Sequence, residues 1–202
     1  SKACAGLFPS CEHSEWLLSG QNSTTCYIYC YQSDFPDTAS SSSAFSDTAS
    51  RVLVAHLRLQ GVERLPRRVF AGMRIARLEL VDGARVLRRG TFAHARQLHS
   101  LLVRNAHFDR FEPGSLAPLA TLTHSVSLDS VPLTSNSSLT ALLAELARLS
   151  SLRELTLSNN ALSYFEVAQG QLNALTRLEL SRQRLAATDS LLLLNAAGSL
   201  PR

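Results

Sequence analysis

The chain has 202 residues, of which 45% are hydrophobic and only 6% aromatic, a composition that fits a core built mainly from leucine. No run of about 18 apolar residues occurs, which excludes a membrane-spanning helix within this chain. Twenty basic against 16 acidic residues give a net charge of +4, a mild excess that by itself says little about partners.

The cysteines indicate a stapled N-terminal cap over residues 1–32. All four of them lie at this end of the chain, at Cys4, Cys11, Cys26 and Cys30, and none follows. An even number of cysteines at one end of an apolar array is typical of disulfides, which persist only in oxidising surroundings. A zinc site is the rival, but the spacing lacks the paired CxxC of structural zinc. Four cysteines leave three pairings open.

Two glycosylation sequons support an extracellular location. They begin at Asn22 and Asn136, each in the pattern Asn-x-Ser/Thr. Cysteines and sequons together predict a secreted or cell-surface protein, and this location disfavours nucleic acid as a partner. The next segment, residues 33–50, is rich in serine and threonine and contains Asp-Thr-Ala-Ser twice. Its low hydrophobicity predicts a flexible loop, with O-linked sugar as the alternative.

From residue 51 to 202 one short phrase recurs six times: an apolar residue, two others, an apolar residue (usually Leu), one other, and again an apolar residue. The central apolar residues of the six copies are Leu57, Leu78, Leu101, Val126, Leu155 and Leu178. Their spacing falls within the period of roughly 20–29 residues that belongs to leucine-rich repeats. Because one repeat cannot bury its own apolar face, the repeats must stack, which predicts an α/β solenoid.

Each Leu-x-Leu unit is predicted to be a short parallel strand with its leucines inward and the intervening residues outward. Stacking then places the outward residues in columns on one face. The candidates for partner binding on these columns are His56, Arg58, Arg77, Glu79, Leu102, Arg104, Asp129, Glu154, Thr156, Arg177 and Glu179. The columns hold no Trp or Tyr, the residues that usually anchor interfaces, so a merely solvated face is the alternative.

The segments that return from strand to strand carry a second apolar signal. Leu65-Pro-x-x-Val-Phe70 is echoed by Leu87-x-x-x-Thr-Phe92, which predicts that Phe70 stacks on Phe92 behind the sheet. Residues 138–150 have apolar side chains at helical spacing (139, 142, 143, 146 and 149), with Ser138 as the expected cap.

The segment from Leu152 to Leu162 matches the pattern LxxLxLxxNxL in full, and residues 65–72 resemble the back of Toll-like receptor and related adhesion ectodomains. The chain therefore resembles the extracellular leucine-rich repeat family. The resemblance implies a right-handed coil with a parallel β-sheet on its concave face, and the crossed disulfides Cys4–Cys26 and Cys11–Cys30. The family's consensus asparagine is present only as Asn160; its equivalents are Val62, Gly83, Ala106 and Gln183. Residues 198–202 are expected to open a seventh repeat.

Three arginines recur with the same step that separates Leu57 from Leu78: Arg64, Arg67 and Arg68 return as Arg85, Arg88 and Arg89. Stacking at that step predicts like charges side by side, about 4.8 Å apart. Unless Glu63 or Asp82 neutralises them, they would suit a sulfated glycan or an acidic protein patch. An ordinary solvated surface is the alternative.

No phosphate-binding loop, nucleophile elbow or HExxH motif occurs, and the six histidines (13, 56, 94, 99, 107 and 124) lack ligand spacing, so we predict solvent-facing histidines, no cofactor and no enzyme. The predicted function is extracellular recognition of another protein, in adhesion, signalling or innate immunity. The alternative is a non-signalling subunit that stabilises an extracellular complex.

Overall fold

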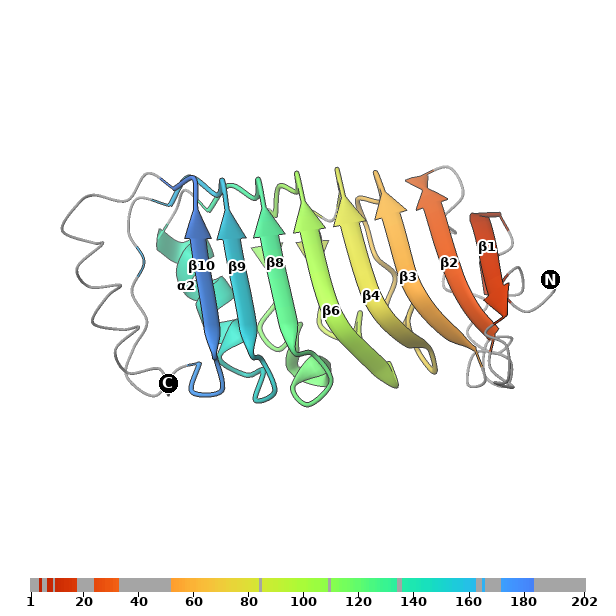
Figure 1. Ribbon diagram of the computed structural model, residues 1–202. Coiled ribbons are helices and arrows are strands. Elements are labelled where there is room, and N and C mark those ends of the chain that lie inside the picture. Colours follow the sequence, from red (N-terminus) through yellow and green to blue (C-terminus); the bar gives the residue numbers. More distant parts are fainter. Residues whose placement is uncertain are drawn as a thin grey trace.

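The structure is a computed structural model that describes residues 4, 7, 8, 10–17, 24–32, 52–83, 85–108, 110–133, 136–162, 165 and 172–183. The described chain is organised around one eight-stranded sheet, in which the strands lie side by side in the order β1-β2-β3-β4-β6-β8-β9-β10 (Figure 1). The strands are β1 (Glu12–Leu17), β2 (Thr24–Tyr31), β3 (Leu53–Gln60), β4 (Arg74–Val81), β6 (Gln97–Arg104), β8 (Ser125–Asp129), β9 (Glu154–Ser158) and β10 (Arg177–Ser181).

The seven strands from β2 to β10 are all parallel, and only β1 runs antiparallel to its neighbour. The predicted parallel sheet is thus confirmed. Its register also matches the predicted alternation, because Leu57 pairs with Leu78, Leu78 with Leu101, and so on to Leu155 with Leu178. Most of these leucines are fully buried, so the inward positions form a continuous apolar core.

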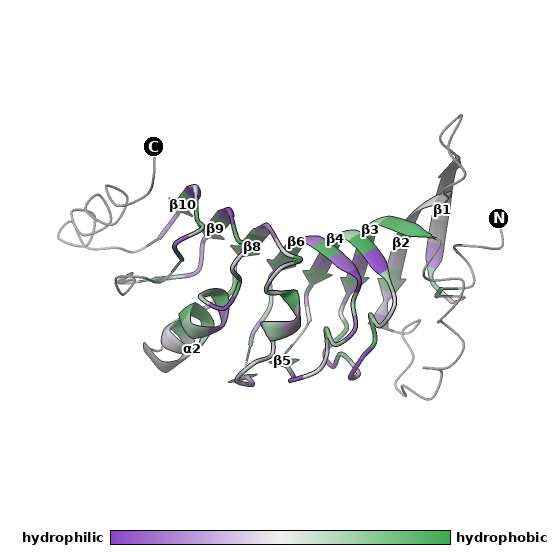
Figure 2. Ribbon diagram, turned by 90° about the horizontal axis from the view of Figure 1, so that it is seen from below, coloured by the Kyte–Doolittle hydropathy of each residue, from purple (hydrophilic) through white to green (hydrophobic). Residues whose placement is uncertain are grey.

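The described segments that connect strands β3 to β9 lie on one side of the sheet, and these strands expose their other side (Figure 2). Figure 2 shows the sheet gently curved, with α2 (Asn136–Leu146) behind it. The 3-10 turn η2 (Ala117–Leu119) and the short pair β5 (Val86–Leu87) and β7 (Arg110–Phe111) belong to the same returning segments. We call the opposite side, which carries the outward residues of the strands, the open face.

The predicted helix is present, but its bounds differ from the prediction. It begins at Asn136, so Ser138 lies inside the helix and is not its cap, and it ends at Leu146. Leu139, Leu142 and Leu146 are buried against the core, as the helical spacing predicted.

Glu145 fixes α2 to the preceding unit, a role that the sequence did not indicate. Its buried carboxylate accepts hydrogen bonds from the backbone N–H groups of Gly114 (2.6 Å) and Leu116 (3.0 Å), and Arg148 lies 3.5 Å away. A buried carboxylate is tolerable here because donors surround it. The predicted stack of Phe70 on Phe92 is confirmed, with ring centroids 5.5 Å apart and planes 15° from parallel.

Each of the six repeating strands ends in the same backbone turn. The residue after the strand adopts a left-handed conformation, with φ between 50° and 73°, at Gly61, Asp82, Asn105, Ser130, Asn159 and Arg182. In the first five of these turns the same residue donates its backbone N–H to a carbonyl of the next strand, at 2.8 to 3.1 Å, as in Gly61 to Val81. These bonds extend the sheet ladder into the turns.

The turns of the last two units are also joined by side-chain amides. Asn160 accepts a hydrogen bond from the Val131 N–H (2.9 Å) and donates to the Leu128 carbonyl (3.1 Å). Gln183 repeats this arrangement one unit later: it accepts from the N–H groups of Asn160 and Leu162 and donates to the Leu157 carbonyl. Gln183 therefore replaces the consensus asparagine at its own position.

The N-terminal segment covers the edge of β3 with β2 and β1. The crossed disulfides are confirmed as Cys4–Cys26 and Cys11–Cys30, with Cα atoms 5.8 and 4.7 Å apart, and all four cysteines are buried. Asn22, residues 33–50 and residues 198–202 lie outside the described residues. Asn136 is the first residue of α2, and its side chain is also outside the description. In the described part of the chain, no helix is long and apolar enough to cross a membrane.

Candidate functional site

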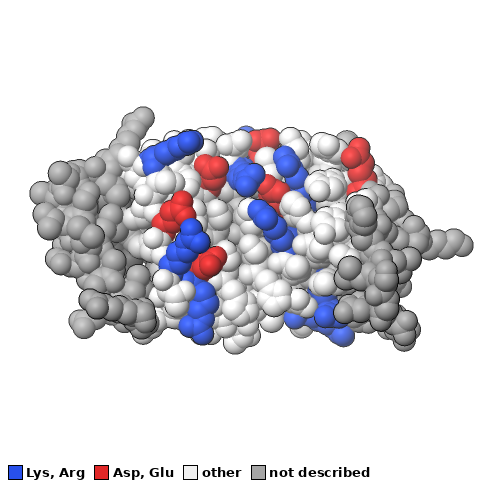
Figure 3. All heavy atoms as spheres, viewed as in Figure 1, with Lys and Arg blue, Asp and Glu red and all other residues white. Residues whose placement is uncertain are grey.

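The predicted outward residues lie in three continuous columns on the open face. Strand register places His56 beside Arg77, Arg58 beside Glu79, and Gln60 beside Val81, and the pairing continues through β6, β8 and β9 to β10. Figure 3 shows acidic and basic side chains interspersed on this face. The sequence thus placed these residues correctly relative to one another; whether they bind a partner is a separate question.

The expectation that the columns contain no aromatic residue was wrong. Strand β2 joins the same sheet, in parallel with β3, and sets Tyr27 beside His56, Tyr29 beside Arg58 and Tyr31 beside Gln60. The sequence analysis began the columns at the first repeat and treated the preceding segment only as a cap. The strict alternation of Tyr27, Tyr29 and Tyr31 with the buried Ile28 and Cys30 was the signal that could have revealed this strand.

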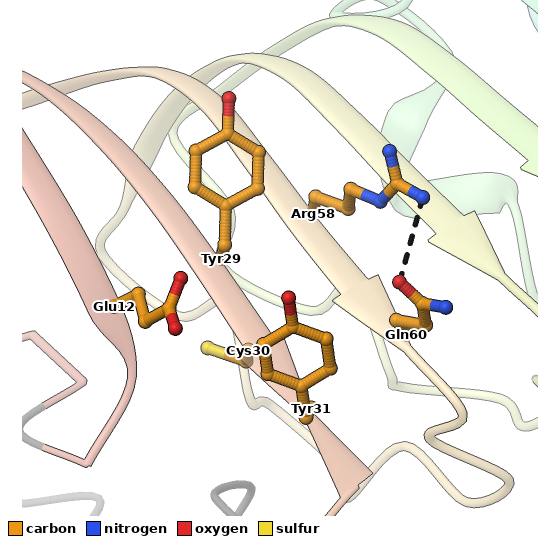
Figure 4. Close-up of a pocket in the computed structure, with 6 residues that line it drawn as sticks. All are labelled: Glu12, Tyr29, Cys30, Tyr31, Arg58 and Gln60. Atoms are coloured by element: carbon orange, nitrogen blue, oxygen red, sulfur yellow. Dashed lines mark hydrogen bonds between the residues drawn. The ribbon is translucent and has the colours of Figure 1, made fainter.

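A hollow of about 390 Å³ lies where β1, β2 and β3 meet, lined by Glu12, Tyr29, Cys30, Tyr31, Arg58 and Gln60. In Figure 4 the two tyrosine hydroxyls point the same way, with Glu12 on one side and Arg58 and Gln60 on the other. Tyr31 is 45% exposed, the only exposed large hydrophobic residue in the described part of the chain.

In the described part of the chain, the side chain of Arg58 makes one weak hydrogen bond at the rim of the hollow, in which its Nη2 donates to Gln60 Oε1 at 3.4 Å. Arg77, one strand further, is exposed. Among the described residues, no carboxylate lies within ion-pair distance of either guanidinium. Within the described residues, neither guanidinium therefore has an ion-pair partner, although Glu12 lines the same hollow as Arg58.

A buried carboxylate links the hollow to the middle of the sheet. The side chain of Glu79 is only 4% exposed; its Oε2 lies 2.9 Å from His56 Nε2, and its Oε1 lies 3.2 Å from Arg104 Nη1. The Tyr29 ring packs edge-on against His56, with centroids 5.8 Å apart. One network thus runs across β2, β3, β4 and β6, and the two partners of Glu79 compensate its loss of hydration.

Burial lowers the pKa of His56 below its ordinary value near 6.5; the neighbouring Glu79 opposes this shift, while Arg77 and Arg58 add to it. His56 is consequently neutral at pH 7, and its Nε2–H donates to Glu79. Deprotonated His56 adds no further positive charge beside the two arginines.

The remaining candidates for partner binding lie on strands β6 to β10 of the open face. Leu102 is buried in its middle, Asp129 accepts from the Ser130 hydroxyl at 3.2 Å, and Arg177 lies 3.5 Å from Glu179. Glu154 is exposed and Thr156 half-buried. Strand register sets these side chains beside one another across β6, β8, β9 and β10, where they form a largely polar surface.

The predicted register of the arginines behind the sheet was wrong by one residue. Leu57 pairs with Leu78 in the strands, but the second unit has one residue more before its return segment, so Arg64 pairs with Val86 and Gly72 with His94. Arg67 therefore lies beside Arg89, whereas Arg68 lies beside Gly90. Arg85 falls beside Glu63, 3.6 Å from its carboxylate. The predicted row of neighbouring arginines is therefore reduced to one pair, Arg67 and Arg89.

Within the described residues, no group of three or more His, Cys, Asp and Glu side chains lies together as metal ligands would. The chain matches no protein-family model, and no curated protein or solved structure is significantly similar to it. Its function must therefore be argued from the geometry of the open face.

Proposed function

We propose that this chain is an extracellular leucine-rich repeat module, a right-handed solenoid that binds another protein on its open, concave face, in adhesion, signalling or innate immunity. The recurring leucine phrase, the parallel sheet with its returning segments on one side, and the two disulfides support this proposal. Such a module presents a broad surface and not an enclosed reaction site.

The hollow at the N-terminal end of the open face is the observation that carries the proposal. Tyrosine and arginine are enriched among the residues that dominate binding energy, and Tyr29, Tyr31 and Arg58 converge there. Cys30, which lies between the two tyrosines on β2, is tied to Cys11. This bridge holds the tyrosine strand in place before binding, so little conformational entropy is lost when a partner docks.

The charges at this end favour an acidic group on the partner. In the described part of the chain, no carboxylate forms an ion pair with Arg58 or Arg77. The carboxylate of Glu79 already contacts His56 and Arg104. A guanidinium recognises a carboxylate with two parallel hydrogen bonds. We therefore assign Arg58 to an acidic side chain of the partner, with Tyr29 and Tyr31 packing around it.

The test is a screen of the purified chain against a panel of secreted and cell-surface proteins, with affinities measured by biolayer interferometry. For a partner so found, Tyr31→Ser and Arg58→Ser should each weaken binding about 30-fold, equivalent to about 2 kcal/mol, the loss expected at a residue that dominates an interface. Arg177→Ser, at the far end of the same face, is the matched control and should change affinity less than twofold.

Equal losses in Arg58→Ser and Arg177→Ser would show that only net charge matters, and no loss in any of the three variants would place the interface elsewhere. The alternative, a stabilising subunit of an extracellular complex, predicts a different result. Its partner would fail to fold or to be secreted without this chain, and the complex would not dissociate on dilution.

A further inference from the structure

His99 and His124 form a pair on two adjacent units, at the start of β6 and just before β8. The backbone N–H of His124 donates to the His99 carbonyl at 2.9 Å, which fixes the two residues side by side. Their rings are 5.4 Å apart between centroids, and the two Nδ1 atoms are separated by 3.5 Å. Both side chains are exposed, so a solute can reach these nitrogens directly.

A chain of hydrogen bonds determines which of these nitrogens carry protons. Arg74 Nε donates to Gln97 Oε1 at 3.2 Å, so the amide NH₂ of Gln97 faces His99 Nε2, 2.6 Å away. His99 Nε2 is then an acceptor, and its proton resides on Nδ1, directed at Nδ1 of His124. In this arrangement His99 carries the one proton that lies between the two facing Nδ1 atoms.

We propose that this pair binds a divalent transition-metal ion, zinc in particular, between the two Nδ1 atoms. Two imidazole nitrogens at about 2.0–2.1 Å from a tetrahedral zinc ion lie about 3.4 Å apart, close to the 3.5 Å already present. Imidazole suits zinc, copper and nickel, whereas calcium and magnesium require oxygen ligands. Two protein ligands leave the other positions to water or to a donor from a bound partner.

Binding requires one proton to move and none to be lost. Nδ1 of His124 is already unprotonated, whereas the Nδ1 proton of His99 must transfer through solvent to Nε2 of the same ring. The Gln97 amide then rotates so that its oxygen accepts this new Nε2–H, and it releases Arg74. Ligating histidines commonly donate their second ring N–H to such an acceptor.

The first test titrates the whole chain with zinc chloride at pH 7.5 in a calorimeter. We expect His99→Ala and His124→Ala each to weaken zinc binding at least tenfold. His107→Ala, which removes an exposed histidine outside the pair, should leave the affinity unchanged. If His124→Ala, checked as folded by circular dichroism, binds zinc as tightly as His107→Ala, the site does not exist.

Gln97→Glu tests the geometry itself. A carboxylate at this position accepts the Nε2–H of His99 without rotating and keeps its contact with Arg74, so zinc affinity should rise severalfold. Nitrogen-15 NMR of the histidine rings should show that in the zinc-bound chain both Nδ1 atoms are unprotonated and metal-bound, whereas both Nε2 atoms carry a proton. Unchanged affinity in Gln97→Glu, or an unprotonated, metal-bound Nε2 atom, would overturn binding between the Nδ1 atoms. Neither result depends on whether the open face binds a protein.

Discussion

The two halves of the sheet are built alike in register but differ in strand length and in what holds their turns together. The strands β2, β3, β4 and β6 each have eight residues, whereas β8, β9 and β10 each have five. In the first half the turns stack backbone on backbone. In the second half the amides of the buried Asn160 and the half-buried Gln183 also join one turn to the previous unit.

The approach of backbones in the first half is close enough to exclude a side chain. A Cβ atom at Gly83 would lie 2.6 Å from the Val62 carbonyl oxygen and 2.8 Å from its nitrogen and carbonyl carbon. The consensus asparagine has no room at this position. Backbone hydrogen bonds join successive turns in both halves; the first half adds close backbone packing at Gly83, and the second half adds the side-chain amides of Asn160 and Gln183.

The open face shows the complementary contrast. Tyrosines, arginines and the buried Glu79 network gather over β2 to β6, whereas β8 to β10 present Ser125, Ser127, Thr156 and one exposed ion pair. The hollow lined by tyrosine and arginine and the amide-joined turns therefore occupy opposite ends of the described sheet.

Replacing Asn160 by Ala should have the largest effect. It leaves the N–H of Val131 and the carbonyl of Leu128 buried without partners, at about 1–3 kcal/mol for each such group, so we expect a loss of about 3 kcal/mol in the free energy of unfolding. Urea denaturation measures it. Asn173→Ala, at an exposed position, is the control and should stay within about 0.5 kcal/mol. A loss below about 1 kcal/mol would mean that water replaces the amide.

Gly83→Ala tests the first half by the opposite mechanism. The added methyl group meets backbone and not a flexible side chain, so the Val62 turn must shift, at a cost of about 2 kcal/mol by denaturation. Gly83→Asn should be at least as destabilising, because the larger side chain cannot reach the acceptors that Asn160 uses. An asparagine that stabilised the protein here would remove the distinction between the halves.

Acidification should lower the free energy of unfolding through His56, which lies in the first half of the sheet. The loss should be smaller than those expected for Asn160→Ala and Gly83→Ala. Because burial holds the pKa of His56 below its ordinary 6.5, the unfolded chain binds this proton more readily than the folded chain. The contribution to stability is complete above pH 6.5 and is lost as the pH falls from there toward the folded pKa. Denaturation at pH 7.5 and 5.5 measures it, and His56→Gln, which can still donate to Glu79, should reduce this pH dependence. An unchanged pH profile in His56→Gln would assign the effect to another group.

The arginines behind the sheet should affect stability least, within about 0.5 kcal/mol, because they are exposed. We propose them as a binding site for an anionic partner, either a sulfated glycan or an acidic patch on a protein. Register places Arg67 beside Arg89, so Arg67→Ser with Arg89→Ser should lower the salt concentration of elution from heparin more than Arg68→Ser with Arg88→Ser does. Equal shifts for the two double variants, which change the net charge identically, would leave only non-specific attraction.

The sequence predicted what depends on local period. Alternation along each Leu-x-Leu unit assigned the inward and outward residues from His56 to Glu179, and the spacing of Phe70 and Phe92 predicted their stack. The disulfide pairing was implied by family resemblance and is confirmed.

What the sequence did not predict depends on contacts between distant segments. The tyrosines of β2 joined the columns through pairing with β3, across a stretch of serine and threonine that hid the continuity. One extra residue in the second unit displaced the arginines by one position, although the sequence repeat itself was read correctly. Glu145 and Gln183 act on neighbouring units far away along the chain, and neither carries a motif that names its acceptor or donor.

The left-handed residue that follows each repeating strand separates a region open to substitution, the strand, from a region open to insertion and deletion, the segment behind the sheet. Up to that residue every unit has the same geometry, and the length differences between units fall in the segment behind the sheet. Insertions and deletions there, such as the one that accommodates α2, leave the columns of the open face in alignment. The back of the molecule can therefore gain or lose whole elements while the open face changes one side chain at a time.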